Sequence, residues 1–156
     1  ELVLDLCEQW YGQLERTDWI VKHACRTMLK AGDSRAMLLF GFGDPKRIDV
    51  NKLKLNKKAL AIGDELQFSF VLKVGTKKSC KIRLEYVVYF AKARGKVGKK
   101  VFQITENTFA PGERAFKRKH SFVDMSTRKH HPGKHEISIV VNGQEKAKAT
   151  LRLVSP

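Results

Sequence analysis

Residues 128–143, RKHHPGKHEISIVVNG, place a turn crowded with cations before an alternating strand and a hairpin turn. Pro132-Gly133 interrupts the chain, and the residues that follow alternate between apolar and polar. Asn142-Gly143 favours a tight reversal because both residues tolerate positive φ. The stretch therefore predicts β structure in this part of the chain, with a basic loop at one end of a strand.

The same two-residue period extends over most of the chain beyond residue 50. Strong alternation covers 66–74, 82–90, 137–141 and 147–153, and weaker patterns cover 52–60, 99–108 and 115–123. About seven short strands separated by Gly and Pro turns are typical of an immunoglobulin-like β-sandwich. The core Trp of antibody domains has no counterpart here, since Trp10 and Trp19 both precede the alternating segments. We therefore predict a mostly β fold.

Residues 1–42 have helical periodicity instead. One amphipathic helix is predicted within residues 2–14. A second is predicted from Trp19 to Ala31, with Thr17 or Asp18 as its N-cap and Gly32 at its end. A short third helix is predicted from Arg35 to Phe40. Two or three such helices are too short to bury their own apolar faces, so they are interpreted as the end of a HEAT-like helical repeat array.

Gly41, Gly43 and Pro45 mark the boundary between the two regions. The predicted domains are residues 1–43 for the helical part, 44–50 for a linker and 51–156 for the sandwich. The chain begins with Glu inside an apolar run, so we expect it to be a piece of a longer polypeptide.

The surplus of positive charge is confined to one region of the chain. Residues 1–50 hold 7 Lys and Arg against 8 Asp and Glu, whereas residues 51–156 hold 24 against 8, so the net charges are −1 and +16. A surplus of this size indicates a polyanionic partner: nucleic acid, an anionic membrane or an acidic protein. No apolar run reaches the length of a membrane span, and we expect no membrane partner.

Motifs for chemistry are absent from the sequence. Cys7, Cys25 and Cys80 fit neither a disulfide framework nor a zinc motif, which indicates free thiols and a cytoplasmic location. No Ser-His-Asp set, phosphate-cradling Gly loop or metal motif is present, so the residues indicate a binding module with no cofactor or metal. His130, His131 and His135 are interpreted as lying beside phosphates, or hydrogen-bonded in the corner, rather than as metal ligands.

Three groups of cations are candidate phosphate contacts, because Lys and Arg neutralise phosphate charge and release counterions. Lys96, Lys99 and Lys100 crowd a predicted hairpin, and Lys22 and Arg26 form a ridge with Lys30 on the second helix. The third group is the turn at 128–134. Solubility and protection of sheet edges are the alternative role of such lysines. The aromatic residues alternate as core positions do, which favours duplex backbone over unpaired bases.

Residues 19–33 (WIVKHACRTMLKAGD) and 38–42 (LLFGF) resemble the end of the helical-repeat region of bacterial DNA alkylation repair glycosylases of the AlkC/AlkD type. The downstream segments resemble the AlkC branch, which carries a C-terminal immunoglobulin-like domain. These segments are 62–64 (IGD), 109–113 (FAPGE), 119–122 (KHSF), 126–128 (STR) and 132–135 (PGKH). His131 departs from the pattern, since we expect an aromatic residue such as Tyr before Pro-Gly.

The resemblance implies a hydrolase of base excision repair that cleaves the N-glycosidic bond of cationic alkylated bases. It implies no metal or organic cofactor, and it implies that the catalytic carboxylates lie upstream of Glu1. We therefore assign no catalytic residue here and expect the chain to be inactive alone. The helix that holds Lys22, His23 and Arg26 resembles one that lines the DNA groove of the family.

Together these observations predict the C-terminal DNA-binding part of a DNA glycosylase, a monomer that clamps duplex DNA containing alkylated bases. The cations should face the concavity that the sandwich forms with the helices. The expected DNA contacts are Lys22, His23, Arg26, Lys96, Lys99, Lys100, Arg128, Lys129, His130, His131 and Lys134. The alternatives are a non-catalytic protein- or carbohydrate-binding β-sandwich and an RNA-binding domain.

Overall fold

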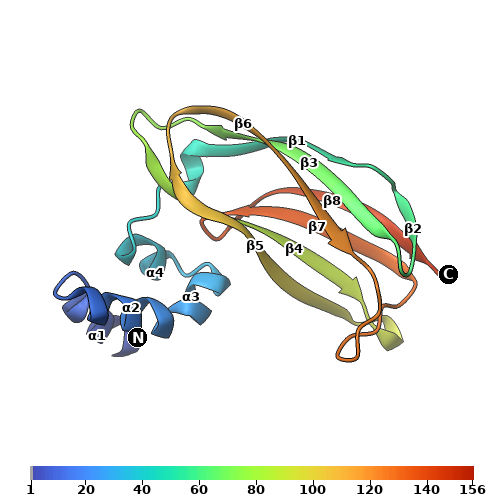
Figure 1. The fold of residues 1–156 in the computed structure, drawn as a ribbon, viewed down its shortest axis with the longest axis horizontal. Coiled ribbons are helices and arrows are strands. Elements are labelled where there is room, and N and C mark those ends of the chain that lie inside the picture. The colour runs from blue at the N-terminus through green and yellow to red at the C-terminus, as the bar shows by residue number, and fades with distance from the viewer. Residues whose placement is uncertain (1) are drawn as a thin grey trace.

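The computed structural model describes residues 2–156. A small helical unit lies at one end of a β-sandwich, and the C-terminus lies at the other end (Figure 1). Among the described residues, no helix is long and apolar enough to cross a membrane.

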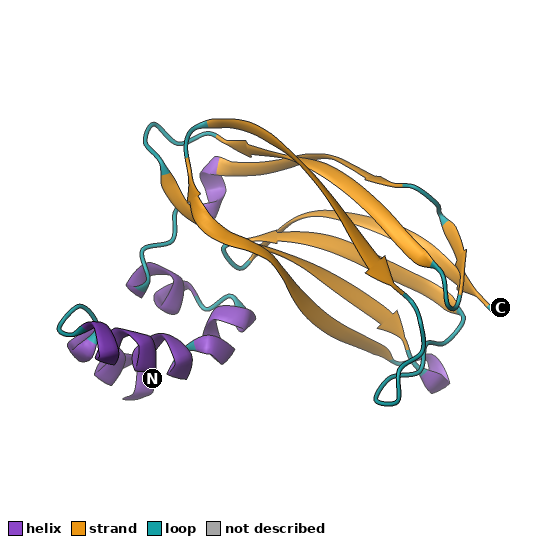
Figure 2. Cartoon of the chain, in the orientation of Figure 1, coloured by secondary structure: helices purple, strands orange, loops and turns teal. Residues whose placement is uncertain are grey.

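The sandwich consists of two sheets with eight strands among the described residues (Figure 2). The order is β1-β3-β6 in the smaller sheet and β2-β8-β7-β4-β5 in the larger one. The strands are β1 (Ile48–Leu55), β2 (Ala59–Ala61), β3 (Glu65–Val74), β4 (Cys80–Ala91), β5 (Val97–Phe109), β6 (Gly112–Ser121), β7 (Gly133–Val141) and β8 (Gln144–Val154). The prediction of a mostly β sandwich is confirmed.

The weak strand predicted at 52–60 is divided between the two sheets. β1 pairs antiparallel with β3, whereas β2 pairs in parallel with β8, from Ala59 opposite Arg152 to Ala61 opposite Val154. Asn56 lies between the two strands and ends the pairing of β1 with β3, and its side chain accepts a hydrogen bond from Gln67 N at 2.9 Å. A change of sheet within one run of residues leaves no mark on a two-residue alternation.

The core lies between the sheets and is filled by the alternating positions. Phe68, Phe70 and Leu72 from β3 face Leu84 and Val88 from β4, and all are buried. Burying a side chain of this size stabilises the fold by roughly 1.5–3 kcal/mol.

The helical unit contains α1 (Leu2–Trp10), α2 (Glu15–Ala24), α3 (Arg26–Ala31) and α4 (Ser34–Leu39). The predicted second helix ends at Gly32, as expected, where φ is 74°. Its predicted start and continuity are wrong. Leu14 is the N-cap, and Asp18 accepts a hydrogen bond from Gly12 N at 2.6 Å instead of capping the helix. The helix then breaks at Cys25, where ψ is near 0°.

The helices bury only part of their apolar surface, in a shared cluster. Cys7, Val21, Cys25 and Leu29 form its centre, and both cysteines are free thiols. Much apolar surface nevertheless stays exposed. The large apolar residues of this unit that are exposed are Leu2, Val3, Leu6, Trp10, Leu14, Trp19, Ile20 and Leu38.

The predicted linker at 44–50 is largely ordered in regular structure. A 3₁₀ turn, η1 (Pro45–Arg47), follows Asp44, whose side chain accepts a hydrogen bond from Lys46 N. β1 then begins at Ile48, so three of the linker residues belong to the sandwich. A second 3₁₀ turn, η2 (Ala93–Gly95), joins β4 to β5.

Candidate nucleic-acid interface

The Asn142-Gly143 turn connects the sandwich to the helical unit. Asn142 is buried with φ at 46°, and its side chain accepts a hydrogen bond from Arg83 N at 2.7 Å. The same side chain donates to Gly43 O at 2.7 Å, and Gly43 N donates to Lys81 O at 2.9 Å. The predicted hairpin turn therefore also fixes the segment that leads out of α4.

Two glycines allow the close approach of this turn to α3. Gly32 and Gly143 both have positive φ, and a Cβ placed on Gly32 would lie 2.8 Å from Gly143 O. Any side chain at either position would push the helix away from the hairpin. The two units are thus held at a defined distance.

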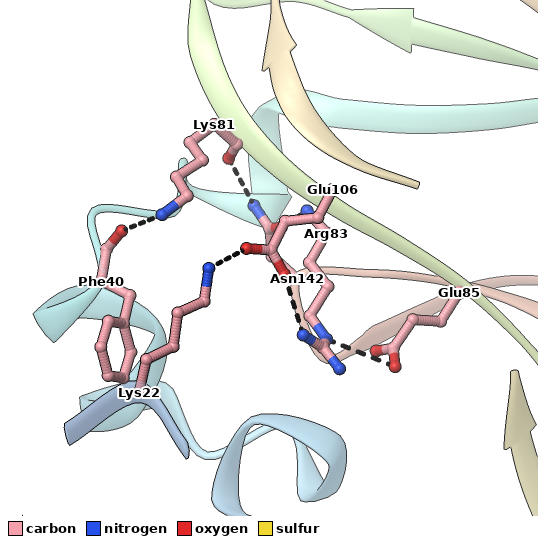
Figure 3. A network of polar contacts seen from close by, with 7 residues as sticks. All are labelled: Lys22, Phe40, Lys81, Arg83, Glu85, Glu106 and Asn142. Carbon is pink, nitrogen blue, oxygen red and sulfur yellow. Dashed lines mark hydrogen bonds and ion pairs between the residues drawn. The ribbon is translucent and has the colours of Figure 1, made fainter. Parts of the chain in front are cut away.

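A network of charged groups continues the junction (Figure 3). Lys22 Nζ of α2 lies 2.6 Å from Glu106 Oε1, and Arg83 lies 2.9 Å from Glu106 Oε2. Arg83 Nε also lies 3.3 Å from Glu85 Oε2. Lys22 was predicted as a DNA contact, but its charge is matched by Glu106. A phosphate would have to compete with that carboxylate.

The carboxyl groups of this network have opposite pKa shifts. Burial raises the pKa of Glu85, more than the nearby charge of Arg83 lowers it. Burial would also raise the pKa of Glu106, but the hydrogen bond from Lys22 and the charges of Lys22 and Arg83 bring it below its usual value. Glu106 therefore stays ionised near neutral pH and can hold the two cations together.

A cleft of about 530 Å³ opens between the helices and β5, and we call its basic rim the concave face. The rim consists of Trp19, His23, Arg26 and Lys30, with Lys99 lining an adjoining pocket beside Lys30. The Trp19 and His23 rings are stacked with centroids 5.4 Å apart, although Trp19 is 69% exposed. His23, Arg26 and Lys99 are exposed as well, so these three predicted contacts are brought together.

The remaining loops lie at the other end of the sandwich. Figure 2 shows η2 and the β6–β7 loop at the end that lies away from the α-helices. There Arg128 Cζ lies over the Phe90 ring, 5.0 Å from its centroid, and Gly133 lies close to Ala91. We call the group Lys96, Arg128, Lys129, His131 and Lys134 the far end. The expectation that all predicted cations face the concavity is wrong, because β4 extends between the two groups.

Lys99 and Lys100 point in opposite directions, since successive side chains of a strand alternate. Lys99 lies near Lys30, whereas Lys100 Nζ lies 5.3 Å from the Phe102 ring centroid. Phe102 borders the sandwich core. The two neighbouring lysines therefore cannot contact the same ligand in the same way.

His130 is the one predicted contact with a buried side chain. Its ring lies against Phe90 and Phe122, and its Nδ1 lies 3.1 Å from Asp124 Oδ1, which also accepts a hydrogen bond from His130 N. His135 is buried too, with Nδ1 3.1 Å from Gly133 O. His130 and His135 thus serve the corner, as one of the two interpretations proposed, and the buried His130 ring is not placed to contact a phosphate. Within residues 2–156 no group of His, Cys, Asp and Glu side chains could hold a metal ion.

The fold and its basic surface define an immunoglobulin-like β-sandwich module carried on a small helical unit. The chain belongs to the family of the C-terminal Ig-like domain of the uncharacterised protein YhaZ, whose model matches residues 49–155. It is 42% identical over 146 residues to the uncharacterised protein YhaZ of Bacillus subtilis (strain 168). That match covers 93% of this chain and 40% of the relative.

A solved structure resembles nearly the whole chain. It is the Pseudomonas fluorescens alkylpurine DNA glycosylase AlkC bound to DNA containing an abasic site analog, with a TM-score of 0.91 and 30% identity. The likeness covers 99% of this chain and 43% of that protein, so the chain spans less than half the length of both relatives. A β-glucosidase from Listeria innocua, with a TM-score of 0.54 and 14% identity over 69% of this chain, shares the sandwich fold alone.

Proposed function

We propose that this chain is the C-terminal DNA-binding part of a DNA glycosylase that removes cationic alkylated bases in the cytoplasm. The observation that carries the proposal is the likeness to a DNA-bound AlkC across both the helical unit and the sandwich, at 30% identity. The exposed apolar side chains of the helical unit support it, because a preceding helical repeat would cover them.

In this proposal the duplex follows the larger sheet from the concave face to the far end. Arg83 lies at the junction and Ala91 at the far end, eight residues apart on β4. At 3.3 Å per residue these positions are about 26 Å apart, which is about eight base pairs of duplex. His23, Arg26 and Lys99 would contact one part of the backbone, and Lys96 and Lys129 the other. We propose that a monomer binds, without cofactor or metal.

The first prediction concerns salt-dependent binding to duplex DNA. The variant K96Q/K99Q should bind a short duplex more weakly than the unaltered chain, and so should R128Q/K129Q/K134Q. Each lost phosphate contact removes about 0.9 from the slope of log K against log salt, so two contacts remove about 1.8 and three remove about 2.7. Fluorescence anisotropy titrations at several salt concentrations measure this slope.

The matched control is K54Q/K73Q/K117Q, which removes three exposed charges from the smaller sheet. Its slope should stay close to that of the unaltered chain. Equal slopes for all four proteins would contradict the assignment of these loops as DNA contacts. Equal loss in the control would mean that net charge alone drives the binding.

The second prediction concerns catalysis. The purified chain should release no base from duplex DNA that carries a cationic alkylated purine, because the proposal places the catalytic carboxylates in the part of the longer protein that precedes Glu1. Chromatography of the released bases after a long incubation measures this. Release of the base faster than in a sample without protein would locate catalysis in residues 1–156 and contradict the proposal that the catalytic carboxylates lie elsewhere.

Competition decides between duplex DNA and the alternative partners. Duplex RNA that displaces labelled duplex DNA at lower concentration would favour an RNA-binding domain. The β-glucosidase likeness concerns the fold alone, and the chain's aromatic side chains mostly fill the core rather than forming an exposed row. We therefore expect no displacement by oligosaccharides.

A further inference from the structure

The open side of the sandwich between β5 and β6 carries a row of aromatic rings. The two strands follow each other in the chain but belong to different sheets, and each forms an edge of its sheet. Phe109 of β5 and Phe116 of β6 contact each other with centroids 6.3 Å apart. Phe102 meets His120 at 5.0 Å further along. The rim of the core is therefore aromatic along this side.

Each of these three phenylalanines has a cation over its ring. Arg114 lies 5.4 Å from the Phe109 centroid, Arg118 lies 5.7 Å from Phe116 and Lys100 lies 5.3 Å from Phe102. We call the six residues the edge seam. None of its cations lies within 4.0 Å of a carboxylate of residues 2–156, whereas the neighbouring Lys119 pairs with Glu65 at 2.9 Å. The charges of the edge seam therefore lack an acidic partner in the described chain.

Arg118 of the edge seam is oriented by its surroundings. Phe116 stacks on Phe70 in the core, with centroids 5.4 Å apart, so the core side of the Phe116 ring is held in place. Arg118 rests over this ring and donates a hydrogen bond to Lys117 O at 2.8 Å. A guanidinium group is planar, and a face that is not against the ring can stack on another planar group.

A row of cations on aromatic rings, two of them planar guanidinium groups, is a surface that suits single-stranded nucleic acid. Unpaired bases stack on arginine planes and aromatic rings, while lysines and arginines contact the backbone. A duplex cannot use the arginine faces in this way, because its bases are stacked on one another.

We propose that the edge seam binds single-stranded nucleic acid, with bases stacked on Arg114 and Arg118 and Lys100 contacting the phosphates. This surface is distinct from the concave face and the far end, and its binding does not depend on the glycosylase assignment. The alternative role for the three cations is to shield the aromatic rim from water. That role requires no particular shape of cation and no ligand.

The test compares variants that separate charge from planarity. R114K/R118K keeps both charges but removes the planar groups, and R114Q/R118Q removes both. Labelled oligothymidylate should bind the Lys variant at least about tenfold more weakly than the unaltered chain, with the salt slope nearly unchanged. The Gln variant should lose affinity and also have a shallower slope. Duplex binding should change far less in the Lys variant.

The control variant K73Q/K117Q removes two exposed cations from the outer face of the same sheet and should keep its affinity for oligothymidylate. NMR signals of the arginine Nε–H groups provide a measurement on the unaltered chain, in case the variants do not fold. Addition of oligothymidylate should shift the Arg114 and Arg118 signals most. The proposal is overturned if R114K/R118K binds as tightly as the unaltered chain, or if these signals do not move.

Discussion

Replacing Asn142 by Ala should lower the free energy of unfolding by about 3 kcal/mol or more. The substitution leaves the buried Arg83 N–H and the Gly43 carbonyl without their partners, and each lost partner of this kind costs about 1–3 kcal/mol. Ala must also adopt the positive φ of 46°, which costs roughly 1 kcal/mol more. Chemical denaturation followed by circular dichroism measures the change.

Asn142→Gly separates the two causes. Gly loses the same hydrogen bonds but adopts a positive φ without strain, so it should be about 1 kcal/mol more stable than Asn142→Ala. In both variants the Gly43 amide should exchange faster with solvent, because its bond to Lys81 O depends on the same junction. A loss of less than 1 kcal/mol in Asn142→Ala would mean that Asn142 does not hold the two units together.

The strands were predictable because a two-residue alternation determines which side chains enter the core. The segments Leu66 to Val74 and Ile82 to Phe90 follow this rule in the structure. The Asn142-Gly143 turn also lies where it was predicted, between β7 and β8. The opposite directions of Lys99 and Lys100 follow from the same alternation, although charge density alone placed them together. Local patterns were enough wherever the structure depends on neighbours in the chain.

The junction and the edge seam could not be predicted from local patterns. Lys22 and Glu106 are 84 residues apart, and only the docking of α2 on the larger sheet makes them an ion pair. Arg114 and Arg118 were missed because a cation over a ring depends on which edges face each other. A weak signal existed, since Arg114, Phe116 and Arg118 alternate on one face of β6.

The buried histidine corner was also hidden, because a basic loop normally faces solvent. In the structure His120, His130 and His135 surround the Phe122 ring, with centroids 4.9, 5.4 and 5.8 Å away. The Nε2 atoms of all three are buried without a hydrogen-bond partner among the described residues. Burial favours the neutral form of an imidazole, and for His120 and His135 this links the stability of the fold to pH.

Acidification should therefore destabilise the chain before its carboxylates are protonated. Burial, helped by the nearby charges of His130, Arg128 and Lys100, lowers the pKa of His120 to about 4, and burial also lowers that of His135. The unfolded chain binds a proton at each site near pH 6.5, where the folded chain does not. Stability is thus complete above pH 6.5 and falls as pH decreases toward 4. His120 alone should contribute a loss of about 2 kcal/mol by pH 5 and about 3 kcal/mol by pH 4.

Denaturation curves between pH 7.5 and pH 5 measure this loss, and His120→Phe is the matched variant because it keeps a ring among Tyr86, Phe90 and Phe102. The variant loses the 3.1 Å hydrogen bond between His120 Nδ1 and the Tyr86 hydroxyl, so it should be less stable than the unaltered chain at neutral pH. Its stability should nevertheless change less with pH, by up to about 1.4 kcal/mol per pH unit for the missing proton. NMR titration of the unaltered chain should find the His120 ring neutral at pH 5. A protonated ring at that pH, or equal slopes for the two proteins, would exclude His120 as the group that links folding to pH.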